Sequence, residues 1–128
     1  MLKLIKRLLK GKSLYLAIAV TIIIAILSLI KIGKQPISFT YLDKVEHAIA
    51  YFVLGFLWLL TFIKRDVKVI VIITVALYGV LLEVLQSELT NYRTFDYMDM
   101  LANTFGALLA FMVFKFIEKK QFKLLNSL

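Results

Sequence analysis

Residues 44–63 read KVEHAIAYFVLGFLWLLTFI, and this stretch decides the fold. From Ala48 to Ile63 it holds 16 residues without a charge. A helix needs roughly 20 residues to cross the hydrocarbon core of a membrane. A spanning helix here must therefore include Glu46 and His47. Because ionisable side chains are costly near lipid, those that remain in a span are the first place to look for a function.

The composition indicates an integral membrane protein. The chain of 128 residues is 62% hydrophobic, with a mean hydropathy of +0.90, whereas a soluble domain is about 45–50% apolar. The absence of cysteine excludes disulfides, thiol catalysis and cysteine-ligated metal. The formal charge of +8 comes from basic residues in short runs between apolar stretches, which favours membrane topology over nucleic-acid binding.

We expect one all-α membrane domain over residues 1–128. The apolar runs predict four transmembrane helices, at about residues 13–30, 44–63, 67–87 and 97–116. The first run is longer than the apolar region of a signal peptide and no small-residue cleavage site follows it, so we expect it to be retained. Residues 1–10 alternate apolar and basic side chains with helical spacing, which predicts a short amphipathic segment on the membrane surface.

The distribution of lysine and arginine predicts the orientation. The N-terminus, the connection between the second and third spans, and the C-terminus together carry 12 of these residues, and the other side carries four. Basic residues favour the cytoplasmic side, so both termini should be cytoplasmic in a multi-pass protein of the cytoplasmic membrane.

This orientation brings two polar clusters to the extracytoplasmic side. One runs from Asp43 to Tyr51, and the other runs from Glu83 to Asn103. At 100° per residue each of the last three spans has one polar or small face, and Gly106-xxx-Ala110 is a small-xxx-small spacing that permits close helix contact. We therefore predict one polar pocket in the outer leaflet.

The candidate site residues follow from their chemistry. Histidine titrates near neutrality, a carboxylate at depth needs a partner or a proton, and arginine suits phosphate or carboxylate recognition. The candidates for catalysis are His47, Glu83 and Asp99, and the candidates for ligand binding are Arg93, Gln86, Tyr51, Asn103 and Asp96. The structural alternatives are interhelical hydrogen bonds and ion pairs, and helix capping by an aspartate. No metal-binding motif such as HExxH occurs, so neither a metal nor a cofactor is expected.

The ordered motif resembles that of the VanZ-like family of small bacterial membrane proteins. The resemblance rests on Asp43-Lys44-x-x-His47-x-x-x-Tyr51, Glu83-x-x-Gln86, and Arg93-x-x-Asp96-x-x-Asp99-x-x-x-Asn103-x-x-Gly106, and it covers about residues 35–115. The founding member of that family is an accessory factor that raises resistance to the glycopeptide teicoplanin. The resemblance thus implies an antibiotic-resistance context, and it brings no catalytic role for any residue.

Three functions remain open from the sequence. The first is a binding or accessory factor at the cell envelope, whose partners are membrane lipids and a lipid-linked cell-wall precursor or glycopeptide. The second is a membrane-embedded hydrolase or transferase that uses histidine and carboxylate, with or without a metal. The third is a scaffold in which the charges hold the helices together. The sequence predicts no oligomeric state.

Overall fold

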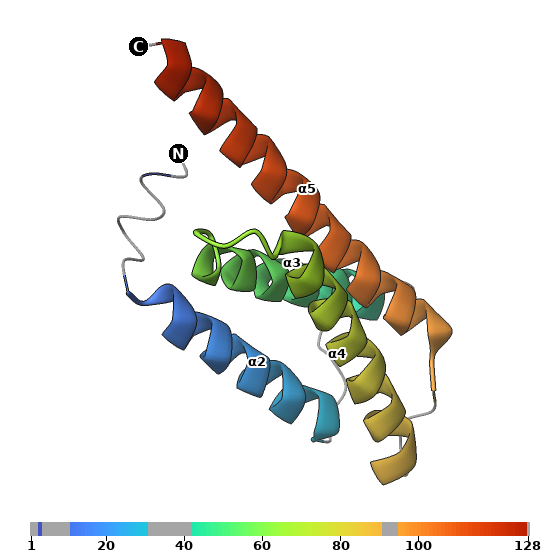
Figure 1. The fold of residues 1–128 in the computed structure, drawn as a ribbon. Coiled ribbons are helices and arrows are strands. Elements are labelled where there is room, and N and C mark those ends of the chain that lie inside the picture. Colours follow the sequence, from blue (N-terminus) through green and yellow to red (C-terminus); the bar gives the residue numbers. More distant parts are fainter. Residues whose placement is uncertain (1–2, 4–10, 31–41, 91–94, 128) are drawn as a thin grey trace.

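The computed structural model describes residues 3, 11–30, 42–90 and 95–127, with side chains as far as Gln121. Four helices make up most of this part of the chain (Figure 1): α2 (Ser13–Leu29), α3 (Leu42–Thr61), α4 (Lys68–Leu89) and α5 (Tyr97–Ser127). No strand occurs within the described ranges. The prediction of an all-α protein is therefore confirmed. Apart from Lys3, the predicted surface segment at residues 1–10 lies outside the described residues.

Three of the helices are long and apolar enough to cross a membrane. They are α3, α4 and the part of α5 from Tyr97 to Gln121. The first helix is apolar but has only 17 residues. At 1.5 Å per residue it is about 25 Å long, a few Å less than the roughly 30 Å hydrocarbon core. Within the described residues, the prediction of four full spans is therefore right for three helices and wrong for the first.

The helices alternate in direction. Pairs along α4 and α5 run in opposite senses: Lys68 meets Glu118 at one end, and Glu83 meets Asp96 at the other. Along α3 and α5 the pairing is parallel, because Lys44 meets Asp99 and Gly55 lies beside Ala110. The C-terminal ends of α2 and α4 therefore lie with the N-terminal ends of α3 and α5. We call this end of the bundle the polar end.

The closest helix pairing is between α3 and α5. A Cβ atom on Gly106 would lie 2.2 Å from the backbone oxygen of Ala48, and one on Gly55 would lie 3.3 Å from the Cβ of Ala110. Small residues allow backbones in membranes to approach closely enough for van der Waals contact. The predicted small-xxx-small face of Gly106 and Ala110 is thus the face of α5 that contacts α3.

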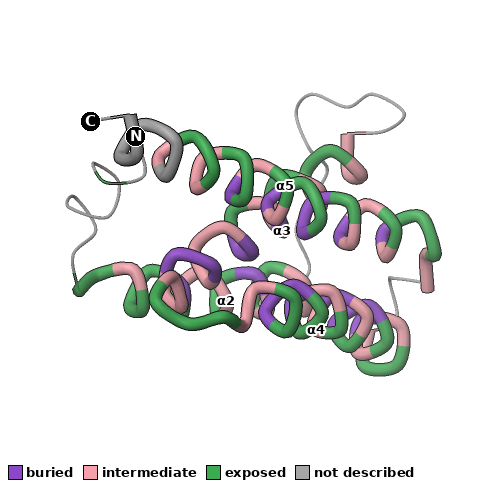
Figure 2. The backbone as a smooth tube through the Cα atoms, turned by 45° about the horizontal axis from the view of Figure 1, so that its top comes forward, coloured by how far each residue is buried: buried purple, intermediate pink, exposed green. Residues whose placement is uncertain are grey.

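Buried and exposed positions alternate along the helices (Figure 2), and apolar side chains occur at both. The buried positions face the neighbouring helices and include Leu54, Leu59, Ala107 and Phe114. Large apolar side chains are also exposed along all four helices, among them Ile22, Val53, Leu77 and Leu108. Exposed apolar faces of this extent mark a surface that contacts membrane or another protein. With three candidate spans, membrane lipid is the partner that these faces fit.

We predict that Gly106→Ala lowers stability more than Gly55→Ala. The added methyl at Gly106 meets backbone, which cannot move aside, whereas at Gly55 it meets side-chain atoms at ordinary to slightly tight distances. Overpacking of this kind costs about 1–3 kcal/mol. Thermal unfolding of the two variants in the same detergent measures the difference. Equal melting temperatures would show that the two helices do not meet at Gly106.

Candidate functional site

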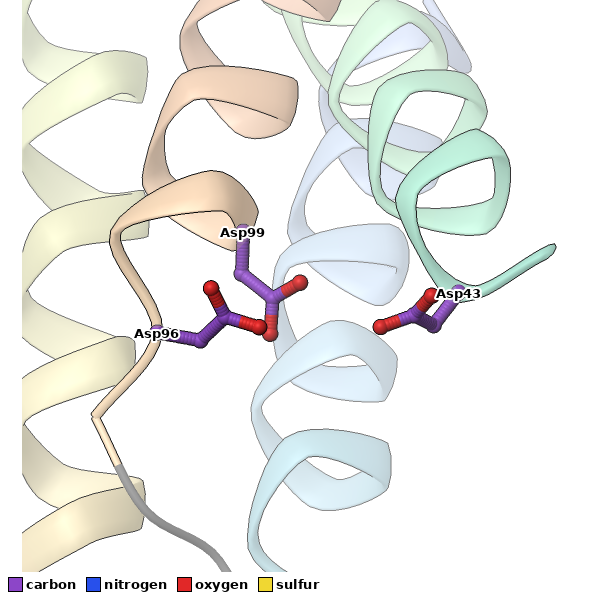
Figure 3. A group of neighbouring side chains, drawn as sticks. All are labelled: Asp43, Asp96 and Asp99. Carbon is purple, nitrogen blue, oxygen red and sulfur yellow. The ribbon is translucent and has the colours of Figure 1, made fainter. Parts of the chain in front are cut away.

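Lys44 lies at the centre of the polar end. Its Nζ donates to Asp43 Oδ2 at 2.6 Å, to Asp96 Oδ2 at 2.7 Å and to Asp99 Oδ1 at 2.7 Å. Asp43 precedes it on α3, whereas the other two carboxylates come from the start of α5, and all three point toward one another (Figure 3). The single ammonium therefore links the N-terminal ends of α3 and α5.

The three aspartates form a cation site whose cation is supplied by the protein itself. One oxygen from each carboxylate lies within 4.8 Å of the others, a grouping that suits a metal ion as well as an ammonium. In this structure Lys44 Nζ is hydrogen-bonded to all three. A metal ion would therefore have to displace Lys44 before it could bind.

Asp96 has two structural roles. Its Oδ1 accepts a hydrogen bond from the backbone N–H of Met98 at 2.9 Å, which caps the N-terminus of α5. Its other oxygen accepts from Lys44, and this hydrogen bond holds the pKa of the Asp96 carboxyl below its usual 3.8. The capping alternative noted from the sequence thus applies to Asp96, which remains a candidate ligand-binding residue as well.

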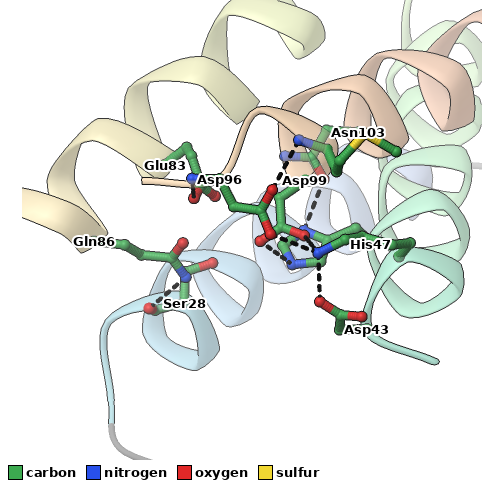
Figure 4. Close-up of polar contacts among 10 residues, drawn as sticks. Ser28, Asp43, His47, Glu83, Gln86, Asp96, Asp99 and Asn103 are labelled. Carbon is green, nitrogen blue, oxygen red and sulfur yellow. Dashed lines mark hydrogen bonds and ion pairs between the residues drawn. The ribbon is translucent and has the colours of Figure 1, made fainter. Parts of the chain in front are cut away.

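His47 faces α5 one turn further along α3 (Figure 4). Its Nδ1 lies 2.8 Å from Asn103 Oδ1, and its Nε2 lies 3.6 Å from Asp99 Oδ2. Asp99 and Asn103 are buried, with exposed fractions of 5% and 2%. The ring is therefore held between an amide oxygen and a carboxylate, an arrangement that can hold or exchange a proton.

Glu83 and Gln86 bring α4 into the same cluster. Both are 2% exposed. Glu83 Oε1 accepts from the backbone N–H of Asp96 at 3.0 Å, and Gln86 Nε2 donates to the backbone oxygen of Ser28 at 2.7 Å. No ion pair joins Glu83 to a described cation. Gln86 Oε1 is buried and has no hydrogen-bond partner among the described residues, which is costly unless a donor is supplied.

The remaining candidates are placed differently. Tyr51 is 2% exposed and packs in the core, with its ring 6.5 Å from that of Tyr78. It also lies against Gly79, where an added Cβ would be 3.0 Å from Tyr51 Cε1. Arg93 falls outside the described residues. The structure therefore brings together His47, Glu83, Gln86, Asp96, Asp99 and Asn103, with Tyr51 one turn deeper.

Lys44 is the site residue that reasoning from the sequence missed. It stands in the Asp43-Lys44-x-x-His47 motif but was given no role in the site, because a lone lysine at a span boundary usually reaches to the interface. The available signal was its spacing of three from His47, which places both side chains on one helix face. With three aspartates expected on the same side, a lysine on that face was the obvious counter-charge.

The fold and the site define a class: a small helical membrane protein with a buried polar cluster at one end of the bundle. The family model described as VanZ/LLP1 matches residues 7–118. The chain therefore belongs to the VanZ/LLP1 family, as the resemblance in the sequence suggested. Among curated proteins and among solved structures, no match to the chain was found.

We predict that Lys44→Met destabilises the protein more than Lys68→Met. The two lysine side chains are equally exposed, at 20% and 19%, but Lys44 serves three carboxylates and Lys68 only Glu118, at 3.4 Å. Removing one partner of a buried ion pair costs roughly 3–5 kcal/mol. We expect about 1–3 kcal/mol here, because Asp43 and Asp96 are partly exposed. Thermal unfolding of both variants in detergent tests this, and a larger loss for Lys68→Met would contradict it.

The loss of stability caused by Lys44→Met should depend on pH. Because the pKa of Asp96 is lowered in the folded protein, its contact with Lys44 contributes stability above the usual value of 3.8. That contribution is lost as the pH falls through the lowered pKa of Asp96 in the folded protein. The gap in melting temperature between the native protein and Lys44→Met should hold steady above about pH 4 and narrow below it.

Proposed function

We propose that this protein is a binding or accessory factor at the extracytoplasmic surface of the bacterial cytoplasmic membrane. It would act there on a lipid-linked or other anionic cell-envelope ligand. The observation that carries the proposal is the convergence of Glu83, Gln86, Asp99 and Asn103, all at most 5% exposed, at one end of a lipid-facing bundle. Polar side chains at this depth are rare unless they serve a function.

The orientation in this proposal follows the basic residues. The end of the bundle opposite the polar end carries Lys64 and Arg65 in the α3–α4 connection and Lys68 at the start of α4, and basic residues favour the cytoplasmic side. Both termini would also be cytoplasmic, with α2 inserted beside α4 although it is a few Å shorter than the hydrocarbon core, a mismatch that local thinning of the bilayer accommodates. Contacts from Thr21 to Tyr78 and from Ser28 to Gln86 support this, because they place the C-terminal half of α2 beside α4.

The ligand chemistry follows from which groups remain available. Lys44 is already neutralised by three aspartates, so Arg93 would hold the anionic group, as arginine does for phosphate. Gln86 Oε1, buried and unpartnered, would accept a donor from the ligand. A lipid-linked cell-wall precursor offers both a phosphate and such donors. By binding that precursor, or the glycopeptide that targets the precursor, the protein would reduce susceptibility to teicoplanin.

Arg93→Ala tests the proposal. In a susceptible bacterial host, expression of the native protein should raise the inhibitory concentration of teicoplanin several-fold, and Arg93→Ala should remove most of that rise. Arg93→Lys should retain part of the rise, because an ammonium keeps the positive charge but loses the two parallel hydrogen bonds that a guanidinium can donate. Lys64→Ala, a charge change at the other end of the bundle, serves as the control. If Arg93→Ala and Lys64→Ala behave alike at equal protein levels, the anion-binding role is wrong.

The second candidate is a membrane-embedded hydrolase or transferase. It is favoured by His47, whose Nε2 lies 3.6 Å from Asp99 while Nδ1 contacts Asn103. With Nδ1–H donating to Asn103 Oδ1, the lone pair lies on Nε2, which could act as general base toward a lipid substrate. The aspartates around Lys44 would also hold a metal for this chemistry if the ammonium were displaced.

His47→Gln and Asp99→Asn distinguish the two candidates. Both variants keep a hydrogen-bonding side chain, so we expect both to fold in detergent. For an enzyme, purified native protein should convert a lipid-linked precursor and the two variants should not, with binding retained. For an accessory factor, the native protein should bind the precursor without any product. Variants that lose both folding and the cell phenotype would identify the cluster as structural.

A further inference from the structure

A large cavity lies in the bundle away from the polar end. It has a volume of about 450 Å³ and opens between α2, α3 and α4. The walls are largely apolar, with Leu54 and Trp58 from α3 and Val71 and Val75 from α4. Sites for small molecules usually measure about 300–1,000 Å³. The cavity is therefore large enough for a ligand, and nothing in the proposed function uses it.

The polar groups in the cavity wall are already satisfied within the protein. Trp58 Nε1 donates to Thr21 Oγ1 at 3.0 Å, which in turn donates to the backbone oxygen of Ala17 at 2.7 Å. Tyr78 donates its hydroxyl to the backbone oxygen of Thr21 at 2.6 Å, and Thr74 donates to that of Ile70 at 2.8 Å. The interior therefore offers no spare donor to a polar ligand, and hydrocarbon is what fits it.

The mouth of the cavity carries a cation. Arg65, in the α3–α4 connection, lines the cavity and is exposed. Among the described acids none forms an ion pair with it, whereas Lys68 nearby is paired with Glu118. On the flank of the cavity Ile70 and Thr74 are also exposed, so the opening faces the side where lipid would lie. An apolar interior with arginine at its mouth matches a molecule with a hydrocarbon tail and an anionic head.

We propose that this cavity binds one acyl chain of an anionic phospholipid, with the phosphate at Arg65. The apolar wall and the arginine at the mouth together select this kind of ligand. The satisfied walls accept hydrocarbon, and the guanidinium at the membrane surface selects a negatively charged headgroup over a neutral one. The site is separate from the polar end: along α3 its wall begins at Leu54, about 10 Å beyond His47, and its mouth lies at Arg65, past the other end of the helix. Its occupancy therefore does not depend on the proposed binding function.

The chain carries its own reporter for this site. Trp58 is the only tryptophan in the protein, and it lines the cavity. Bromine atoms on lipid acyl chains quench tryptophan fluorescence on contact. In the full chain reconstituted in bilayers of mixed lipid, brominated phosphatidylglycerol should quench Trp58 at least two-fold more, at equal mole fraction, than brominated phosphatidylcholine.

Matched variants separate the cavity from the surrounding bilayer. Arg65→Ala should abolish the preference for the anionic lipid, whereas Lys64→Ala, which removes an adjacent exposed charge that does not line the cavity, should leave it. Thr74→Phe, placed at the open flank, should reduce quenching by the anionic lipid to the level of the neutral one. Gel filtration and circular dichroism establish that each variant is folded.

The opposite results would overturn the proposal. Equal quenching by the two lipids would show that Trp58 senses only the bulk bilayer. Equal effects of Arg65→Ala and Lys64→Ala would show a general surface attraction without a site.

Discussion

The rest of the structure depends on the close approach of α3 and α5 at Gly106. The backbone oxygen of Ala48 lies 2.2 Å from where a Cβ on Gly106 would be, so only glycine allows the two helices to meet at this distance. In lipid, helix association relies on packing and polar contacts more than on the hydrophobic effect. This crossing places Lys44 against Asp99 and His47 against Asn103. The polar end is thus a consequence of a backbone contact about one turn beyond Lys44 along α3.

The charges at the polar end account for both stability and candidate function. The side chain of Lys44 is 20% exposed and that of Asp99 is 7% exposed, so removing either one would leave the other largely buried and unpaired. A cluster satisfied in this way would serve only as a structural link between helices. Gln86 differs from the rest of the cluster, because its Oε1 is buried and accepts no hydrogen bond. That unpaired acceptor is the feature that a purely structural explanation leaves unexplained.

Much of this arrangement follows from sequence, for identifiable physical reasons. The short apolar runs force Glu83 and Asp99 into the spans, and helical spacing aims them inward. Other features could not be predicted from the sequence. Lys44 satisfies three aspartates only because α5 begins beside it, and the sequence does not show that distance. The first span was expected at full length from its composition, yet α2 ends at Leu29. Hydrophobic periodicity predicts the faces and approximate lengths of helices, whereas the residue at which a helix ends also depends on the segments packed around it.

The short helix α2 buries few side chains completely and receives hydrogen bonds from α3 and α4. Only Ala17 and Ile24 are buried on it, while its carbonyl oxygens accept from Tyr78 near the cavity and from Gln86 at the polar end. Burying two small or medium side chains stabilises a helix little compared with the core pairing of α3 and α5. A displacement of α2 would therefore break hydrogen bonds at both sites together.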